Sequence, residues 1–152
     1  MPLILRRATS ADAKELTEVY LRSRNTLASY APLAHSEAAV RDWVANILIP
    51  SGSVTVAVNN DRIVGMAAHS IFDGVTWLNQ LYVYPQFKRQ GIGTSLLESV
   101  KSQTDGKLQL YTFQMNHDAA AFYERHGFVA IAYSDGSRNE EGCPDVLYCL
   151  TW

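Results

Sequence analysis

A short basic turn that contains two glycines is the part of the chain best suited to chemistry. Lys88-Arg89-Gln90-Gly91-Ile92-Gly93 follows a predicted strand and precedes the periodic apolar residues of a predicted helix. A helix N-terminus carries unpaired backbone N–H groups and a partial positive charge, and both attract phosphate. Glycines let the backbone approach such a group closely. The turn therefore predicts a local binding site for a phosphorylated ligand.

Two common phosphate-binding patterns do not fit this turn. A dinucleotide-binding turn has a third glycine where this chain has Leu96, and it belongs to a parallel βαβ unit. A Walker-type loop needs a lysine between its last glycine and the following serine or threonine, whereas Gly93 directly precedes Thr94. We therefore expect neither a dinucleotide site nor an NTPase.

The turn resembles the pyrophosphate loop of the GNAT superfamily of N-acetyltransferases, whose pattern is Q/R-x-x-G-x-G/A. Lys88 stands where the family has glutamine or arginine. We expect little effect, because backbone N–H groups make most of the contacts in such a loop and lysine keeps the charge. A second segment, Asn116 to Phe128, resembles the family signature N-x-x-A-x-x-F-Y-x-x-x-G-F at every specified position. The resemblance covers most of the chain.

The resemblance implies acetyl-CoA as the acetyl donor and indicates the residues that hold it. The strand backbone at Leu81, Tyr82 and Val83 is expected to pair with the pantetheine arm as an added strand would. The turn is expected to hold the pyrophosphate through Lys88, Arg89, Gln90, Gly91, Ile92, Gly93 and Thr94. The other expected contacts come from the second signature, namely Asn116 to pantetheine, with Ala119, Phe122 and Tyr123 beside the cofactor. No metal is expected, because the four histidines lack metal-ligand spacing.

Tyr123 takes the position of the general acid in the family signature. A tyrosine hydroxyl, with an ordinary pKa near 10, can donate a proton to the departing CoA thiolate. Some relatives also carry a glutamate base on the strand before the turn. That strand here is Trp77-Leu78-Asn79-Gln80-Leu81, with amides in place of a carboxylate. The general base is therefore left open.

His35 and Glu141 are the candidate residues for the acceptor side of the reaction. His35 precedes a predicted helix in a region that often borders the acceptor pocket in this fold, and it is either a base or a polar residue at a helix start. Glu141 belongs to the acidic loop from Asp135 to Asp145. Its carboxylates either receive a cationic amine or face solvent in a hairpin loop. We expect His69, on a predicted strand, to be a hydrogen-bonded core histidine.

Hydrophobic periodicity predicts one mixed α/β domain over residues 1–152, in the order β-α-α-β-β-β-α-β-α-β-β. We expect a central, mostly antiparallel sheet of about seven strands flanked by about four helices. Ser36 is the predicted N-cap of the second helix, and Val40, Trp43, Val44 and Ile47 form its apolar stripe. Asn59-Asn60-Asp61 and Asp73-Gly74 are predicted hairpin turns.

Composition narrows the classes of partner. The formal net charge is -2, with 47% hydrophobic and 18% charged residues, so no global positive field attracts nucleic acid or an anionic membrane. The N-terminus lacks the order of a signal peptide, and we expect a cytoplasmic protein. Cys143 and Cys149 have no redox or zinc spacing and are expected to be free thiols. The apolar chain end at Trp152 fits either core packing or a homodimer contact.

These patterns leave three functions open. The first is acetylation of a small-molecule primary amine. The second is acetylation of a protein N-terminus or lysine, which needs an open peptide groove, while the helical region from Tyr20 to Leu48 favours a walled site. The third is a non-catalytic acyl-CoA-binding module, favoured by the missing strand carboxylate.

Overall fold

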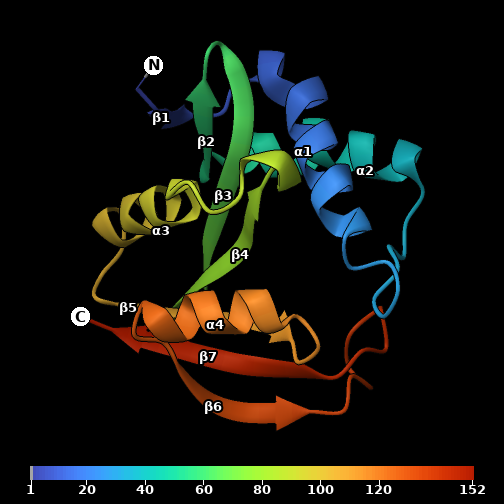
Figure 1. Ribbon diagram of the computed structural model, residues 1–152, viewed down its shortest axis with the longest axis vertical. Coiled ribbons are helices and arrows are strands. Elements are labelled where there is room, and N and C mark those ends of the chain that lie inside the picture. Colours follow the sequence, from blue (N-terminus) through green and yellow to red (C-terminus); the bar gives the residue numbers. More distant parts are fainter. Residues whose placement is uncertain (1) are drawn as a thin grey trace.

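The computed structural model describes residues 2–152, and the elements follow the predicted order. The strands within these residues are β1 (Ile4–Arg7), β2 (Val54–Asn59), β3 (Arg62–Phe72), β4 (Val75–Val83), β5 (Lys107–Phe113), β6 (Val129–Ser134) and β7 (Asp145–Thr151). The α-helices within them are α1 (Ala13–Asn25), α2 (Glu37–Trp43), α3 (Ile92–Ser102) and α4 (His117–Arg125) (Figure 1). None of the helices in this part of the chain is long and apolar enough to cross a membrane. The predicted fold class is confirmed.

One parallel contact interrupts an otherwise antiparallel sheet of order β1-β2-β3-β4-β5-β7-β6. This contact joins β4 to β5, with Trp77 in register with Gln109 near the start of β4. Asn79 is the extra residue of a β-bulge in β4 where it pairs with β3. A bulge increases the local twist of a strand. The bulge therefore lies where β4 begins to leave β5.

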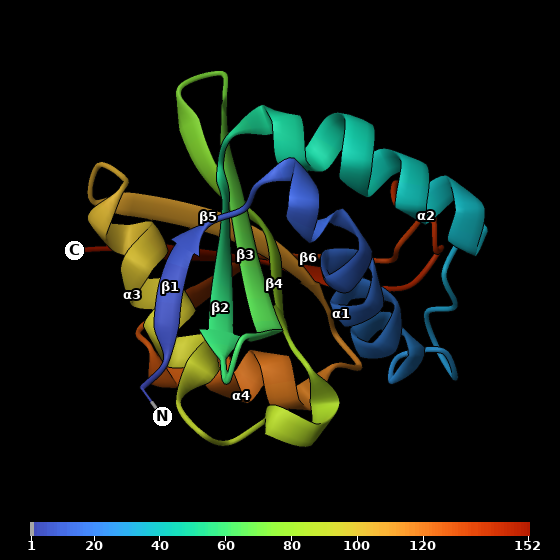
Figure 2. The ribbon, with the colours of Figure 1, turned by 90° about the horizontal axis from the view of Figure 1, so that it is seen from above.

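Helices cover both faces of the sheet (Figure 2), and each face has its own apolar core. On one face α3 and α4 pack against the strands through buried residues such as Leu96, Leu97 and Tyr123. On the other face α1 and α2 pack through residues such as Leu16 and Val40. Each fully buried leucine or valine contributes about 1.5–3 kcal/mol by leaving water. These cores fix α1 and α4 on either side of the gap between β4 and β5.

The second helix differs from the prediction at its C-terminal end. Ser36 caps α2 as expected, and its Oγ accepts a hydrogen bond from Ala39 N at 3.1 Å. Residues Val44–Leu48 then form a π-helical turn, which moves the following side chains around the axis. Ile47, predicted to lie in the apolar stripe, is 62% exposed, and Leu48 is buried instead. That part of the prediction is wrong.

His69 on β3 is not the hydrogen-bonded core histidine that the sequence predicts. Its Nδ1 is the one buried side-chain nitrogen or oxygen among residues 2–152 that has no hydrogen-bond partner. Burial lowers the pKa of His69, because the charged imidazolium would lose hydration. The ring is therefore partly buried, and its buried Nδ1 makes no hydrogen bond.

The polar loop between β6 and β7 is folded back on itself. Asn139 Nδ2 donates to Cys143 O at 2.7 Å, and Cys143 N donates to Asn139 Oδ1 at 3.2 Å. Gly136, with φ +87°, packs directly against the Cys143 backbone. Gln114 N, just after β5, donates to Pro144 O at 2.9 Å. The loop is therefore a fixed wall and not an open hairpin.

Candidate active site

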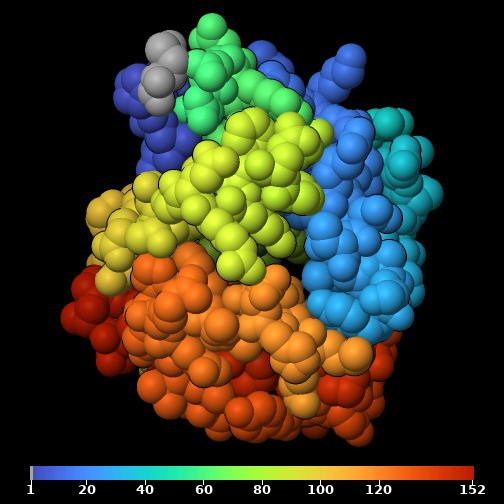
Figure 3. Space-filling model, in the orientation of Figure 1, coloured from blue at the N-terminus to red at the C-terminus, as the bar shows by residue number. Residues whose placement is uncertain are grey.

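A cavity of about 1160 Å³ opens where β4 and β5 part. Its walls are α1, β4, the glycine turn, α4 and the β6–β7 loop. Figure 3 shows the surface hollowed where α1, the turn and α4 meet. One end, the basic end, contains Lys88, Arg89 and Arg125. The other, the acidic end, contains five carboxylates and two cations: Asp118, Asp135, Glu140, Glu141, Asp145, Arg24 and Arg138.

The edge of β4 presents backbone groups to the cavity. Tyr84 N donates to Val64 O of β3 at 2.7 Å, so the preceding residue, Val83, turns its backbone groups to the opposite edge. Ser23 Oγ on α1 donates to Val83 O at 3.3 Å, in agreement with this alternation. By the same alternation the N–H and C=O of Leu81 point into the cavity. An extended ligand can pair with them as a strand would.

The glycine turn leaves the start of α3 without a side-chain cap. Gly91, the N-cap residue, has φ +80° and no side chain to bind the first N–H groups of the helix. The backbone of Arg89 also has a left-handed conformation, with φ +66°. Such turns gather backbone N–H groups into an anion-binding hollow. A Cβ on Gly93 would lie 3.3 Å from the Phe122 ring, so this glycine lets α3 approach α4 closely.

Both ends of α4 are fixed by hydrogen bonds beside the cavity. Asn116 Oδ1 accepts from Ala119 N at 3.2 Å, which leaves the Asn116 amide N–H groups for the cavity that it lines. At the other end His126 Nε2 lies 3.1 Å from Thr94 Oγ1 and its ring lies 4.5 Å from that of Phe122. Burial lowers the pKa of His126. This contact ties α4 to the first turn of α3.

Tyr123 lies on the cavity side of α4 and is 8% exposed. The rings of Phe128 and Tyr148 pack against it, with centroids 5.3 and 6.1 Å away. The Tyr123 hydroxyl has no hydrogen-bond partner within residues 2–152. Because the only fully buried side-chain nitrogen or oxygen without a partner in these residues is His69 Nδ1, the hydroxyl of Tyr123 is accessible, and the accessible space beside it is the cavity. Burial raises the pKa of Tyr123, because the tyrosinate would lose hydration. The hydroxyl is therefore protonated at neutral pH.

Two ion pairs join the β6–β7 loop to the helical region at the acidic end. Arg24 Nη2 donates to Glu141 Oε2 at 3.3 Å, and their side chains are 4% and 14% exposed. His35 Nε2 lies 2.8 Å from Glu140 Oε2, and both of these side chains are exposed. The buried pair thus lies at the cavity wall and the exposed pair at the surface.

Most of the predicted site residues come together at this cavity. Those that line it are Leu81, Tyr82, Val83, Lys88, Arg89, Gly91, Ile92, Gly93, Thr94, Asn116, Ala119, Phe122, Tyr123 and Glu141. Gln90 and His35 lie outside its lining. Tyr20 and Arg24 also line the cavity and were not predicted as site residues, although helical spacing puts both on the same side of α1 as the buried Leu16.

Comparison with known families agrees with this arrangement. Residues 50–130, more than half of the chain, match the family model described as the acetyltransferase (GNAT) domain. A comparison with curated proteins finds no match.

Solved structures share the fold over almost the whole chain. A GNAT-family acetyltransferase from Bacillus cereus has a TM-score of 0.79 at 17% identity, covering 99% of this chain and 98% of its own. The PaiA N-acetyltransferase from Thermoplasma acidophilum, solved with coenzyme A, has a TM-score of 0.71 at 19% identity, covering 100% of both chains. An N-acetyltransferase from Staphylococcus aureus has a TM-score of 0.77 at 16% identity, covering 99% of both.

Proposed function

The chain belongs to the GNAT family and is an N-acetyltransferase, and we propose that it moves the acetyl group of acetyl-CoA to a primary amine of a small molecule. The observation that carries this proposal is the single cavity that contains both signature segments, with Tyr123 on its wall. The basic end suits the phosphates of the donor, and the acidic end suits a cationic amine. The free thiols Cys143 and Cys149 fit the cytoplasm that we propose as its location.

The residues at the basic end fit coenzyme A in shape and charge. The uncapped N-terminus of α3 offers backbone N–H groups to the pyrophosphate, and Lys88 and Arg89 add positive charge. The open edge of β4 at Leu81 and Val83 suits the amides of pantetheine. The amide of Asn116 is a further donor for the same arm. The bound donor supplies a thioester whose sulfur leaves as a thiolate.

Tyr123 is the proposed general acid. The amine nitrogen forms a bond to the acetyl carbonyl carbon while the carbon–sulfur bond breaks. An ammonium acceptor first releases one proton to solvent, and the attacking nitrogen loses a second as the amide forms. The thiolate takes a proton from Tyr123. The second proton lost by the attacking nitrogen then returns to Tyr123, so the net release is one proton per turnover. The cavity position of the hydroxyl supports this role.

A small acceptor is favoured over a protein acceptor by the way the acidic end is closed. The Arg24–Glu141 and His35–Glu140 pairs hold the β6–β7 loop against the helical region that begins with α1. An extended peptide would need a groove across this contact. The closed wall supports a compact amine.

Acetyl transfer should be detectable as release of the CoA thiol. We expect purified protein with acetyl-CoA to release thiol when supplied with amino acids or small primary amines, and to release less with peptides of free N-terminus or with lysine-containing peptides. Mass spectrometry would identify the acetylated product. Binding of acetyl-CoA without turnover of any amine or peptide would favour the acyl-CoA-binding module instead.

Gly93→Ala should weaken acetyl-CoA binding. Its Cβ would meet the Phe122 ring at 3.3 Å and displace the start of α3 from α4. We expect a loss of about 1 kcal/mol, or about fivefold in Kd, measured by isothermal titration calorimetry. Phe122→Leu removes the atoms that clash, so Gly93→Ala should have a smaller effect in that background. Equal losses in both backgrounds would contradict the proposed contact.

A further inference from the structure

Arg24 is a buried cation whose hydrogen-bonding capacity is only partly used. Its side chain is 4% exposed, and Nη2 donates to Glu141 Oε2 and to Ala31 O, each at 3.3 Å. The guanidinium carbon lies 5.5 Å from the centre of the Phe113 ring. Arginine has five N–H donors, and these contacts use those of one terminal nitrogen. Arg24 also interacts with the Tyr20 hydroxyl as a hydrogen-bond partner, so only part of the remaining donor set on Nη1 and Nε is left for another acceptor.

Arg24 lies on the wall of the cavity. Among residues 2–152 the one side-chain polar atom that is both inaccessible and without a partner is His69 Nδ1. Nη1 and Nε of Arg24 are not among such atoms, and Arg24 lines the cavity. Tyr20 lines the same wall, and burial raises its pKa, so its hydroxyl adds a protonated donor beside the guanidinium. This wall can bind an anion through bidentate hydrogen bonds.

A carboxylate of opposite charge lies directly beside these donors. Glu141 uses Oε2 for Arg24, and its 14% exposed side chain lines the cavity. Oε1 has no partner in the described chain, so it is available to accept from an ammonium group. The site therefore places the anion-binding guanidinium of Arg24 next to Glu141 Oε1, which can bind a cation.

We propose that the acceptor is a zwitterion that carries its primary amine next to a carboxylate, as an α-amino acid does. Arg24 binds the carboxylate of the acceptor, and Glu141 receives its ammonium group before deprotonation. This inference rests on the proposed acetyl transfer and specifies its acceptor class. Arg24 thereby sets specificity, since an amine without the carboxylate leaves a buried guanidinium edge unpaired.

Matched acceptors test the carboxylate requirement. Leucine, phenylalanine, tyrosine and arginine would each be compared with the α-amide and with the decarboxylated amine, namely isopentylamine, phenethylamine, tyramine and agmatine. For the side chain that is accepted best, we expect kcat/KM for the amino acid to exceed that for its amine at least about tenfold. Equal or better use of the amines or amides would overturn the inference, as would acetylation of peptides alone.

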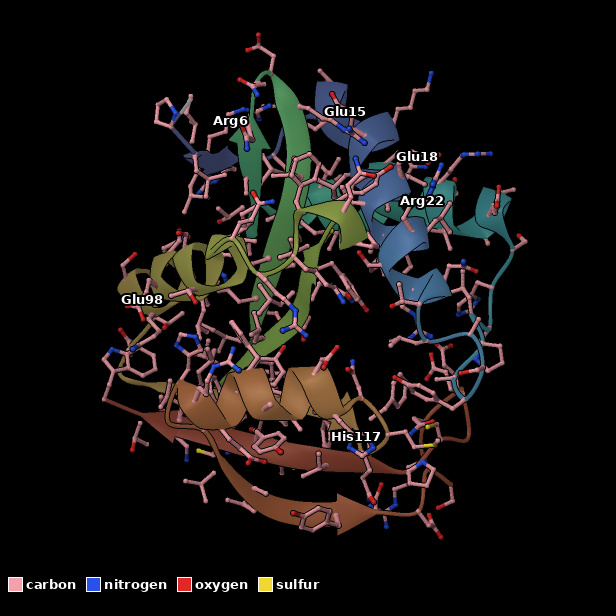
Figure 4. All side chains as sticks on the ribbon, in the orientation of Figure 1. Arg6, Glu15, Glu18, Arg22, Glu98 and His117 are labelled. Carbon is pink, nitrogen blue, oxygen red and sulfur yellow. The ribbon has the colours of Figure 1, made fainter. Side chains whose placement is uncertain are left out.

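Arg24 variants test the assigned residue. Arg24→Gln should remove the preference by lowering kcat/KM for the amino acid much more than for the amine, with acetyl-CoA affinity unchanged. The double variant Arg24→Gln, Glu141→Gln avoids an unpaired buried carboxylate, and circular dichroism would verify that it is folded. Arg22→Gln is the control, because Arg22 lies on α1 beside Glu18 with an exposed side chain (Figure 4). A preference that survives in a folded Arg24 variant would overturn the assignment.

The proposed function and this inference fail in different ways. Absence of acetyl-CoA binding, or of acetyl transfer to any acceptor, would contradict the proposed function and this inference with it. Acetyl transfer that shows no carboxylate preference would contradict this inference alone.

Discussion

Tyr123→Phe should lower kcat by about a hundredfold or more while leaving acetyl-CoA affinity within about twofold. The substitution removes one oxygen and keeps the ring that packs against Phe128 and Tyr148. Because the hydroxyl reaches the cavity and has no partner in the described chain, its removal leaves no unpaired protein group behind. The loss should therefore appear in the chemical step and not in stability or donor binding.

The raised pKa of Tyr123 is compatible with an acid role. A tyrosine that holds its proton more tightly is a weaker donor to a fixed base, and a free thiol has an ordinary pKa near 8.5. The burial that raises the pKa of Tyr123 would also destabilise a thiolate released into the same cavity, because each anion loses hydration. The hydroxyl can then stabilise the leaving sulfur by a hydrogen bond that strengthens as charge develops.

The pH dependence gives a second readout for Tyr123. The acid form of a group predominates below its pKa, so a raised pKa extends the protonated tyrosine to higher pH. We expect kcat/KM of the wild type to rise with pH as the acceptor ammonium loses its proton, without a fall up to about pH 10. Tyr148→Phe is the control, because it removes a neighbouring hydroxyl that donates to Glu124 at 2.7 Å. Wild-type kcat in Tyr123→Phe would refute the acid role.

Much of the fold follows from local patterns in the sequence. Ser36 caps its helix because its hydroxyl can reach a backbone N–H three residues on, and the Asn59–Asp61 turn forms because Asn60 and Asp61 tolerate positive φ. The errors also have local causes. No propensity signals the π-helical turn that exposes Ile47, the β-bulge beside His69, or the unpaired Nδ1 of His69.

The parts of the candidate site that lie within one short segment could be predicted from the sequence. The parts that depend on contacts between segments far apart in the sequence could not. The turn at Lys88–Thr94 and the helix signature are each defined by residues only a few positions apart, so the sequence alone could identify both segments, and both line the cavity. Arg24 and Glu141 are separated by 117 positions, and their contact depends on how the β6–β7 loop folds against α1. The divergence of β4 from β5, which creates the cavity, is likewise a property of the whole sheet.

Gly136→Ala should lower the free energy of unfolding by about 3 kcal/mol or more. Gly136 has φ +87°, where a side chain adds strain, and a Cβ there would lie 2.4 to 2.7 Å from the backbone atoms of Cys143. Backbone atoms cannot change rotamer to avoid the contact. The Asn139–Cys143 hydrogen bonds would have to stretch or break to admit the methyl group. Urea unfolding followed by circular dichroism measures this loss.

Gly142→Ala separates the clash from the backbone strain, because Gly142 lies in the same loop with φ +63° and nothing within 4 Å of its Cβ position. It should cost only about 1 kcal/mol. Equal losses in the two variants would show that strain, and not the packing of Gly136 on Cys143, holds the loop. Because the loop carries Glu141, Gly136→Ala should also raise KM for the acceptor while the acetyl-CoA affinity of the folded protein stays unchanged. That result would show that the packing of Gly136 on Cys143 positions the proposed acceptor half of the site independently of the proposed donor half.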